Sequence, residues 1–489
     1  MRAYVSLGAN LGRPMLQLLE AIGRLTAAGL PPAAVSSAYA TEPQGGPPQP
    51  WYTNCAIALD TDLAPEALLA ELRAVEDVMG RERALRWGPR VIDLDLLVYG
   101  DVVRDTPDLQ LPHPRLHERA FALVPLAELA PGLVLPGRGP VERLAREWSG
   151  RQAVRPLGPL PGYLAPPPGT RGRLLQLLEA AAGRGVSGER LARDVGVSRA
   201  AVWKHMQRLR AEGFGVMSDR GTGYRLPVEG QGAPLRAGAI GRLAVDRVGR
   251  VLHVLPRVDS TNRLARDLGL QGAPEGTAIL ASEQTAGRGR RGRSFASPPG
   301  GVYLSCVLRP RLAPAPATRC TLLAALAVCE ALEGFGLHPE IKWPNDVLLP
   351  EGKVAGILLE MVAREDQVDF LVLGMGINVC QAPPGVGAAA VWAAGARVGR
   401  AEVARALLQR LDADYGALMD GGWDQLLDAW RRRSRTLGSW VRVDLADGPP
   451  IEGVAKDVQE DGALLVECGG RTLVVYAGDV THLRPGTKR

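Results

Sequence analysis

Residues 155–170 read RPLGPLPGYLAPPPGT, and this stretch decides how the rest of the chain is divided. Six of its sixteen residues are proline and three are glycine. Its apolar residues do not recur with the period of a strand or of a helix. We therefore expect a semi-rigid, extended spacer rather than an element of a core. The alternative, a proline-rich surface loop inside one domain, is disfavoured because the two flanks carry separate and complete sets of catalytic signals.

The length and composition of the chain indicate several globular domains. With 489 residues, 46% of them hydrophobic and 22% charged, the chain is too long for one core and has ordinary globular composition. No apolar run is long enough to cross a bilayer and the N-terminus lacks the plan of a signal peptide, which predicts a cytoplasmic protein without a membrane partner. The six cysteines are scattered without a C-x-x-C pair, and we expect buried free thiols.

The charges of the chain are distributed unevenly. The net charge is +6, and residues 190–225 carry eight lysines and arginines against three acidic residues. This local excess suggests an anionic partner. Only five residues of the chain are lysine. Unless they lie on the surface by chance, these lysines mark positions where a compact point charge is needed.

The segment from residue 81 to residue 100, RERALRWGPRVIDLDLLVYG, predicts a phosphate- and metal-binding site. Asp93 and Asp95 alternate with apolar residues at the period of a strand, so both carboxylates leave the same face. Two carboxylates roughly 7 Å apart can hold Mg²⁺, which prefers oxygen ligands and nucleotide phosphates. Arginines precede them in a loop broken by glycine and proline, a combination suited to phosphoryl transfer. A charged edge strand with solvated arginines is the alternative.

Several motifs of the first 154 residues occur in the order of a known family. They are SLGANLG at residues 6–12, T-x-P at 41–43, Y-x-N at 52–54, RWGPRVIDLD at 86–95, and PH at 112–113 followed by R-x-F at 119–121. With them, this part resembles hydroxymethyl-dihydropterin pyrophosphokinase of the folate pathway. The resemblance implies a ferredoxin-like α+β fold and diphosphate transfer from ATP to 6-hydroxymethyl-7,8-dihydropterin. Gln44, usually apolar in the family, and the short loop from Arg83 to Arg86 depart from the pattern.

The same resemblance implies roles for individual residues. The implied catalytic residues are Arg81, Arg83, Arg90, Asp93 and Asp95, of which the two aspartates would bind Mg²⁺. The implied ATP-binding residues are Arg86, Trp87, Arg90, His113 and Arg119, and Trp87 is alternatively a hydrophobic anchor of its loop. The implied pterin-binding residues are Thr41, Pro43, Tyr52, Asn54, Glu76 and Phe121, with the two aromatic rings stacked on the flat heterocycle.

The segment after the proline-rich stretch predicts a winged helix-turn-helix. Two helices over residues 171–182 and 188–195 are followed by a turn, an N-cap at Ser198 and a third helix reaching residue 212. Glycines 221 and 223 suggest the tip of a β-hairpin, the wing. We expect DNA binding, and a module used only for docking is the alternative. The candidate DNA-binding residues are Ser198, Arg199, Lys204, Arg208 and Arg220.

A glycine- and arginine-rich loop, GRGRRGR at residues 287–293, is the most informative feature of the C-terminal part. Its glycines let the backbone approach an anion and its arginines supply the countercharge. We expect it to be mobile when empty and ordered by a phosphate or adenylate. An RNA-binding or solvated basic loop is the alternative. Short strands with Asp-Gly turns from residue 438 onward predict a small β-barrel.

Together with DSTN at 259–262, KWPND at 342–346, KVAGILLE at 353–360 and GMGIN at 374–378, this loop makes residues 171–485 resemble biotin–protein ligase. The form it resembles carries a winged helix and doubles as the biotin operon repressor. The resemblance implies that biotin and ATP give biotinyl-5′-AMP, which the lysine of a biotin carboxyl carrier protein then attacks. It also implies operator DNA as a partner and a homodimer formed through the ligase domain.

Residue roles follow from this resemblance in the same way. The implied catalytic residues are Arg290 and Lys353. The implied ATP-binding residues are Arg290, Arg291, Trp343, Asn345 and Asn378, with Asp346 helping to place Mg²⁺. The implied biotin-binding residues are Ser260, Thr261, Asn262, Gln284, Gly287, Arg288, Gly289, Lys353 and Gly356.

The sequence therefore predicts a multidomain α+β protein with two enzymes on one chain. The expected parts are a pyrophosphokinase domain (1–154), a linker (155–170), a winged helix-turn-helix (171–228), an α+β ligase catalytic domain (236–435) and an SH3-like C-terminal β-barrel (436–489). Three alternatives stay open. The C-terminal part could be a ligase with a vestigial DNA-binding domain or a ligand-gated transcription factor without ligase activity. The N-terminal part could bind ATP without transferring a diphosphate.

Overall fold

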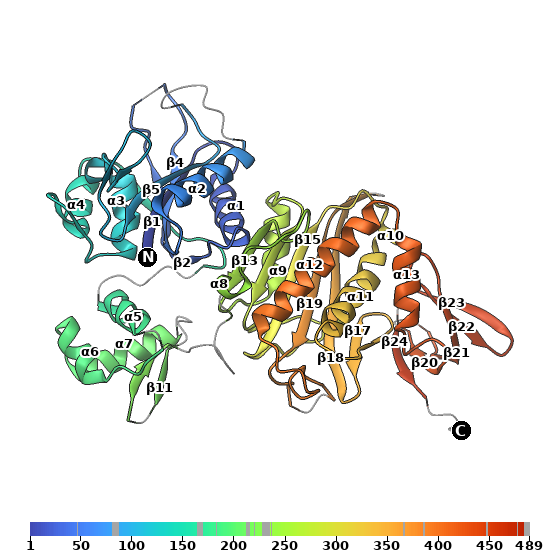
Figure 1. The fold of residues 1–489 in the computed structure, drawn as a ribbon. Coiled ribbons are helices and arrows are strands. Elements are labelled where there is room, and N and C mark those ends of the chain that lie inside the picture. The colour runs from blue at the N-terminus through green and yellow to red at the C-terminus, as the bar shows by residue number, and fades with distance from the viewer. Residues whose placement is uncertain are drawn as a thin grey trace. The chain divides into compact units, whose positions relative to one another are not determined.

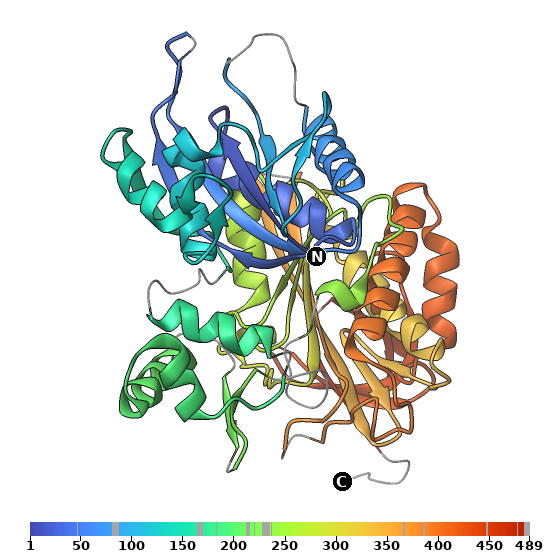
Figure 2. The ribbon, with the colours of Figure 1, turned by 60° about the vertical axis from the view of Figure 1, so that its left-hand side comes forward.

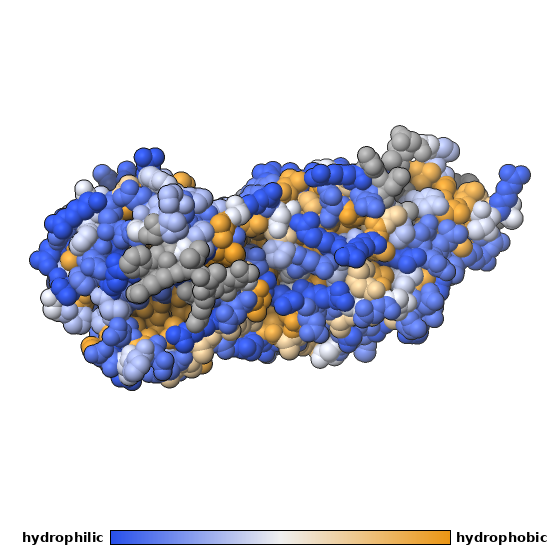
Figure 3. Space-filling model, turned by 90° about the horizontal axis from the view of Figure 1, so that it is seen from above, coloured by the Kyte–Doolittle hydropathy of each residue, from blue (hydrophilic) through white to orange (hydrophobic). Residues whose placement is uncertain are grey.

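The computed structural model divides the chain into two compact units, Met1–Arg242 and Leu243–Arg489, which are drawn as ribbons in Figures 1 and 2. It describes residues 1–45, 47–80, 88–163, 170–181, 183–211, 216–219, 221–226, 235, 237–364, 367–384, 387–445, 448–476 and 478–483. The face of the molecule seen in Figure 3 is mostly polar, with apolar side chains in small separate groups. Among the described residues, no helix combines the length and the apolar character needed to cross a membrane.

The first part of unit 1 is an antiparallel sheet between two layers of helices (Figures 1 and 2). The strands lie in the order β10-β3-β4-β1-β5, and β2 also pairs with β4. Their bounds are β1 (Arg2–Ala9), β2 (Pro32–Val35), β3 (Ser37–Thr41), β4 (Tyr52–Asp60), β5 (Asp93–Tyr99) and β10 (Val154–Pro159). The helices are α1 (Pro14–Ala27) and α2 (Pro65–Val78) on one face, and α3 (Ala120–Leu129) and α4 (Val141–Ser149) on the other. The order β3-β4-β1-β5, with helices after β1 and β4, is the expected ferredoxin-like arrangement.

Small elements complete this part of the fold. They are β6 (Arg104–Asp105), β7 (Gln110–Leu111), β8 (Val134–Leu135), β9 (Gly139–Pro140) and the 3-10 helix η1 (Leu116–Glu118). The core on the side of α3 and α4 gathers apolar residues from β5, η1 and both helices, among them Leu97, Leu123 and Leu144. Because apolar side chains of β5 pack in this core, the direction in which its polar side chains point is fixed as well.

The proline-rich stretch departs from its expected role as a spacer. Residues 155–159 belong to β10, an edge strand in which Val154 pairs with Thr41 and Pro159 with Ser37. Leu160, just beyond, is buried. Proline lacks the N–H that a central strand needs, but an edge strand tolerates it. Most side chains of β10 are exposed or half-buried, so the strand shows no apolar alternation. Residues 164–169 of the stretch lie outside the described residues, and Thr170 begins the helix that follows.

The second part of unit 1 is a winged helix-turn-helix, as expected. It consists of α5 (Thr170–Ala180), α6 (Gly188–Val195), α7 (Arg199–Ala211) and the hairpin strands β11 (Met217–Asp219) and β12 (Gly223–Arg225). Ser187 caps α6, and Gly196, with φ of 75°, ends it in the left-handed conformation that glycine adopts readily. The core comprises Leu174, Leu178, Leu191, Val202, Met206, Leu209 and Val216.

Unit 2 contains a seven-stranded sheet in the order β13-β14-β15-β19-β18-β17-β16. β13 and β14 are parallel and the other neighbours are antiparallel. The strands are β13 (Val251–Leu255), β14 (Thr277–Ala281), β15 (Gly301–Leu308), β16 (Glu340–Lys342), β17 (Asp346–Leu349), β18 (Gly352–Arg364) and β19 (Gln367–Asn378). The helical elements of the chain from residue 237 onward are α8 (Ala237–Ile240), α9 (Thr261–Leu270), η2 (Arg290–Gly292), α10 (Pro314–Ala317), α11 (Arg319–Glu333), α12 (Arg400–Met419) and α13 (Trp423–Arg432).

The C-terminal part of unit 2 is a five-stranded antiparallel sheet in the order β23-β22-β21-β20-β24. Its strands are β20 (Trp440–Asp444), β21 (Ile451–Val458), β22 (Leu464–Cys468), β23 (Arg471–Val475) and β24 (Asp479–His482). Closure of this sheet as an SH3-like barrel stays a prediction. The six cysteines of the chain are free and five of them are buried, as expected.

Candidate functional sites

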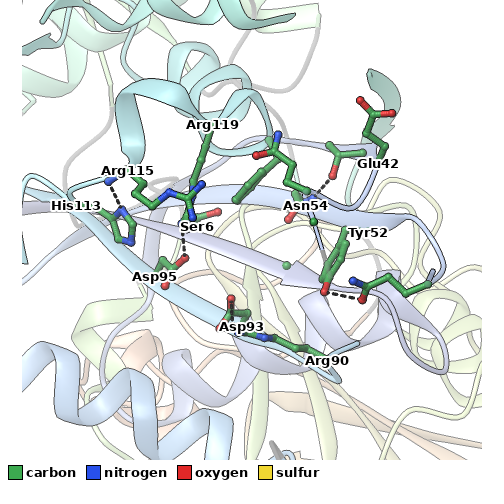
Figure 4. Close-up of a pocket in the computed structure, with 16 residues that line it drawn as sticks. Ser6, Glu42, Tyr52, Asn54, Arg90, Asp93, Asp95, His113, Arg115 and Arg119 are labelled. Atoms are coloured by element: carbon green, nitrogen blue, oxygen red, sulfur yellow. Dashed lines mark hydrogen bonds and ion pairs between the residues drawn. The ribbon is translucent and has the colours of Figure 1, made fainter. Parts of the chain in front are cut away.

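The first site is a pocket of about 280 Å³ at the ends of β1, β3, β4 and β5. It brings together residues from most of the N-terminal motifs. They are Ser6, Gly8, Thr41, Glu42, Gln44, Gly45, Gln49, Tyr52, Asn54, Arg90, Asp93, Asp95, His113, Arg115, Arg119 and Phe121. Figure 4 shows His113, Arg115 and Asp95 on one side of this group and Tyr52, Asn54 and Glu42 on the other, with Asp93 and Arg90 below.

Two carboxylates leave the same face of β5, as their spacing predicted. Asp93 forms an ion pair with Arg90 at 2.5 Å, and Asp95 lies 3.7 Å from an Nη of Arg119. Burial and the neighbouring Asp93 carboxylate raise the pKa of Asp95 to about 6, while Arg119 opposes the shift. The two acids therefore repel each other, and a cation placed between them would relieve that repulsion.

The basic side of the pocket is held by backbone contacts. The Arg90 N–H donates to Asn10 Oδ1 at 2.7 Å, and the Arg90 carbonyl accepts from the Asn10 N–H.

Burial, followed by the charge of Arg119, lowers the pKa of His113 to about 4, so the imidazole is neutral at pH 7. Its Nδ1 accepts the Arg115 N–H at 3.2 Å, which leaves Nε2 as the protonated donor.

The opposite end of the pocket suits a flat polar ring. Tyr52 and Phe121 supply aromatic surface, and the Tyr52 hydroxyl lies 3.1 Å from both Gln49 Oε1 and the Gly88 carbonyl oxygen. Asn54 Nδ2 donates to Thr41 Oγ1 at 2.7 Å, and both residues are almost fully buried. A Cβ on Gly8 would lie 2.5 Å from Asn54 Oδ1, so only glycine allows this close approach.

Some of the expected residues lie elsewhere. Glu76 does not line the pocket, because it is buried on α2 and accepts the Leu94 N–H at 2.7 Å. It thereby holds β5 between the two aspartates. Pro43 is likewise absent from the lining of the pocket. Arg81, Arg83, Arg86 and Trp87 lie outside the described residues. The lining residues that were not among the candidates are Ser6, Gly8, Glu42, Gln44, Gly45, Gln49 and Arg115, although Ser6 and Gly8 belong to a motif that was recognised.

The second site is a pocket of about 170 Å³ at the N-terminus of α9, beside the arginine-rich loop. Thr261 donates both its N–H and its hydroxyl to Gln284 Oε1, at 2.8 and 2.9 Å. Ser305 donates to Asn262 Oδ1 at 2.6 Å, and Asn262 Nδ2 donates to Glu360 at 2.8 Å. The expected residues in its lining are Ser260, Thr261, Asn262, Gln284, Arg288, Gly289, Arg290, Asn345, Asp346, Lys353 and Gly356.

Glycines form the floor of this second pocket. A Cβ on Gly374 would lie 2.0 Å from Asn262 Oδ1, and one on Gly376 would lie 2.4 Å from the Phe295 ring. Gly287 is outside the lining but shapes the loop, because a Cβ there would meet the Phe295 carbonyl at 2.4 Å. On this central strand the glycines thus let the Asn262 and Phe295 side chains pack directly against the backbone.

The arginine-rich loop closes onto a carboxylate from the C-terminal sheet. Asp479 lies 4.0 Å from Arg290, 3.5 Å from Arg291 and 2.7 Å from Arg293. Arg291 adopts φ of 54°, a left-handed conformation that costs energy in a residue with a Cβ. Across the pocket, Lys353 Nζ pairs with Asp346 at 2.6 Å. A cluster of cations therefore surrounds the position where an anion would bind.

A third pocket, of about 180 Å³, adjoins the second through Arg290, Asn345 and residues 357–358. Trp343 lines it, and its indole N–H donates to the Gly462 carbonyl at 3.0 Å, so the C-terminal sheet contributes a wall. Asn345 Oδ1 accepts from Arg290 at 3.0 Å. Asn378 lines neither pocket, since it is buried and donates to the Ala389 carbonyl at 3.1 Å. Arg291 is also outside both linings.

The candidate DNA-binding residues lie on one surface of α7. The side chains of Arg199, Lys204 and Arg208 are exposed. Ser198 precedes the helix, and its hydroxyl accepts the Ala201 N–H at 3.1 Å, as an N-cap does. Arg220 lies outside the described residues.

The folds and pockets define the class of the chain: two α+β parts, each with a pocket lined by acidic and basic side chains, and a winged helix-turn-helix. Four family descriptions match it in this order. The 7,8-dihydro-6-hydroxymethylpterin-pyrophosphokinase (HPPK) family matches residues 4–131, an HTH domain 171–225, the biotin/lipoate A/B protein ligase family 254–378 and the biotin protein ligase C terminal domain 436–483.

Individual relatives extend these matches. The bifunctional ligase/repressor BirA of Bacillus subtilis is 34% identical over 319 residues, covering 63% of this chain and 97% of the relative. A biotin–[acetyl-CoA-carboxylase] ligase of Mycobacterium tuberculosis is 39% identical over 245 residues, covering 48% and 90%. The 2-amino-4-hydroxy-6-hydroxymethyldihydropteridine pyrophosphokinase of Pseudomonas aeruginosa is 49% identical over 148 residues, covering 29% and 90%. The chain belongs to the HPPK family through its N-terminal part and to the BirA family of biotin protein ligases through the rest.

Proposed function

We propose that the chain is a bifunctional enzyme that transfers diphosphate from ATP to 6-hydroxymethyl-7,8-dihydropterin and attaches biotin to a carrier-protein lysine. For the first activity, the decisive observation is the pocket that joins Asp93 and Asp95 to a buried polar and aromatic end. For the second, it is the arrangement of Lys353 and the arginine-rich loop around one pocket. Both pockets pair a specific recognition surface with charges that stabilise phosphate.

In the first site, the pterin would stack between Tyr52 and Phe121, with Asn54 and Thr41 at its edge. Its hydroxymethyl oxygen would attack the β-phosphorus of ATP, and AMP would leave as the bond between the α- and β-phosphoryl groups breaks. Arg119 and the protonated Nε2 of His113 would hold the transferred diphosphate. The proton of the attacking hydroxyl would pass to water, because Arg119 and the protonated Nε2 cannot accept it. The role of these two groups is therefore positioning and charge neutralisation.

The carboxylate pair fits Mg²⁺, because both groups are hard oxygen ligands and their mutual repulsion favours a bound cation. Among the described residues, no cluster of three or more His, Cys, Asp or Glu could hold a metal. Asp93 and Asp95 would therefore share the ion with phosphate oxygens and water. Such an ion would neutralise charge on the phosphates of ATP.

In the second site, biotin would lie on the glycine floor with its polar ring toward Thr261, Asn262 and Gln284. Its carboxylate would attack the α-phosphorus of ATP, and pyrophosphate would leave to give biotinyl-5′-AMP. Lys353 would stabilise the charge that develops on the acyl phosphate, and Arg288 and Arg290 would hold the anion in place. The lysine of the carrier protein would then attack the acyl carbon and release AMP.

Measuring both reactions on the whole chain tests this assignment, because each activity is the control for the other. We expect Asp93→Asn to abolish pterin-dependent AMP formation and leave biotin transfer to a carrier domain unchanged. Lys353→Gln should lower biotin transfer by about a hundredfold or more. The matched control is Lys456→Gln, since Lys456 is half-exposed and pairs with Glu467 on the C-terminal sheet. Full biotin transfer by Lys353→Gln, or full pterin turnover by Asp93→Asn, would contradict the assignment.

We further propose that α7 binds operator DNA, that a dimer forms through the ligase domain, and that Asp346 helps to place Mg²⁺ in the ligase. The exposed cations of α7 support the first point. Binding of duplex DNA that weakens steeply with salt and strengthens with biotin and ATP is the expected result. DNA affinity that is the same with and without biotin and ATP would favour a ligase whose winged helix no longer responds to biotin.

A further inference from the structure

Trp203 is an exposed tryptophan in the second helix of the helix-turn-helix. It lies on α7, and 55% of its surface is accessible to solvent. The apolar side of the helix is formed by Val202, Met206 and Leu209, which are buried in the core of the domain. Trp203 is not part of this core, so the fold does not require an aromatic residue there. A single exposed apolar residue is ordinary on its own, but this one lies on the helix that a helix-turn-helix places against DNA.

The neighbours of Trp203 identify the chemistry of this partner. Residues three and four apart on a helix share a surface, which places Trp203 with Arg199 and Gln207. Among the side chains of α7 that the structure describes, the exposed ones are Arg199, Ala200, Trp203, Lys204, Gln207 and Arg208. Three of these six are cations and none is acidic, which suits a polyanion rather than an apolar protein surface. Trp203, the only aromatic residue of this set, therefore lies among side chains that can bind phosphate.

The position of the helix in the fold indicates that the polyanion is duplex DNA. In a helix-turn-helix the second helix lies in the major groove, and residues near its N-terminus contact base edges. Trp203 is the fifth residue of α7, which spans Arg199–Ala211. The apolar group that base pairs present in the major groove is the C5-methyl of thymine. An exposed indole ring that lies outside the core is complementary to that methyl group.

We propose that Trp203 contacts thymine methyl groups in the major groove and so determines part of the sequence preference of the winged helix. The inference rests on the proposed binding of operator DNA and adds the base that is read. Burying one methyl group strengthens binding about fourfold, so two half-sites bound by a dimer give about fifteenfold. Removal of the indole should leave the salt dependence unchanged, because no phosphate contact is lost.

The test uses a duplex enriched from a random-sequence library by the full chain in the presence of biotin and ATP. The same duplex is then synthesised with uracil in place of thymine, which removes only the methyl groups. We expect the wild-type chain to bind the uracil duplex about 4- to 15-fold more weakly. Trp203→Ala should bind the thymine duplex weakly and show no difference between the two, and Trp203→Phe should keep part of the difference.

Trp440→Ala is the matched control, because Trp440 is a similarly exposed tryptophan on the C-terminal sheet. This variant should keep the full difference between thymine and uracil. Equal binding of both duplexes by the wild-type chain, or an undiminished difference in Trp203→Ala, would overturn the inference and leave DNA binding intact. Failure to enrich any duplex while biotin transfer persists would overturn both the inference and the repressor role, but not the ligase activity.

Discussion

Replacing Asp95 by asparagine should stabilise the N-terminal part of the chain and abolish diphosphate transfer. Burial and the Asp93 carboxylate raise the pKa of Asp95 from 3.8 to about 6. Two pKa units correspond to about 3 kcal/mol if the shift counts in full. Because 32% of the side chain is exposed, solvent screens part of it. We therefore expect a gain of about 1–2 kcal/mol at pH 7, or about 2–8 °C in Tm for a domain of this size.

The sign of the pH dependence follows from linkage. The folded-state pKa lies above the unfolded-state value, so the ionised carboxylate costs stability. This cost is absent below about pH 4, grows between about pH 4 and pH 6, and is constant above that range. The difference between Asp95→Asn and the wild-type chain should therefore be largest at neutral pH and vanish toward pH 4. An asparagine has no proton to lose at this position.

The assay is thermal unfolding of the full chain in EDTA, followed at several pH values. Asp60→Asn is the control, because Asp60 is an exposed carboxylate whose pKa is lowered by hydrogen bonds from Arg2. That variant should gain no stability at pH 7. An Asp95→Asn chain that is less stable than the wild type at pH 7, or whose gain in stability over the wild type is the same at pH 4 and pH 7, would refute the reasoning. Addition of Mg²⁺ and ATP should stabilise the wild-type chain more than the variant.

Three further outcomes follow from single positions. Gly374→Ala would place a Cβ 2.0 Å from Asn262 Oδ1, so biotin-dependent pyrophosphate release should show a KM for biotin raised tenfold or more, with pterin turnover unchanged. Asp414→Asn should stabilise unit 2 by about 2–4 kcal/mol at pH 8, because burial raises the pKa of Asp414 to about 7, and the gain in denaturant unfolding should shrink as the pH falls toward 4. A fragment ending at residue 153 should be cut by protease much faster than one ending at residue 163, because it lacks β10.

The local parts of both sites could be predicted from the sequence. The alternation of Asp93 and Asp95 with apolar residues correctly placed both carboxylates on one face, because a strand fixes that direction. Short-range geometry of this kind depends only on the period of the element. Ser260, Thr261 and Asn262 were instead expected together through the resemblance to biotin–protein ligase, and they line one pocket.

Other features could not be predicted, because they depend on contacts between distant segments. Asp479 meets Arg293 across nearly two hundred residues, and no spacing in the sequence indicates that pair. Glu76 was expected at the pterin edge, but the packing of α2 against β5 directs its carboxylate to the Leu94 N–H. The strand β10 was missed because an edge strand with exposed side chains lacks the apolar alternation by which strands are recognised.

The pairing of β10 with β3 also bears on how the protein is made. The N-terminal sheet cannot complete its edge until the ribosome has added and released the chain through Pro159. At about 5–20 residues per second, translation of residues 1–159 takes roughly 8–32 s. Until then β3 has an unpaired edge on the nascent chain, open to pairing with other strands. Once β10 has emerged, it would pair with β3 and close this edge while the winged helix is being translated. The segment that joins the two enzymes therefore also determines when the sheet of the first enzyme is complete.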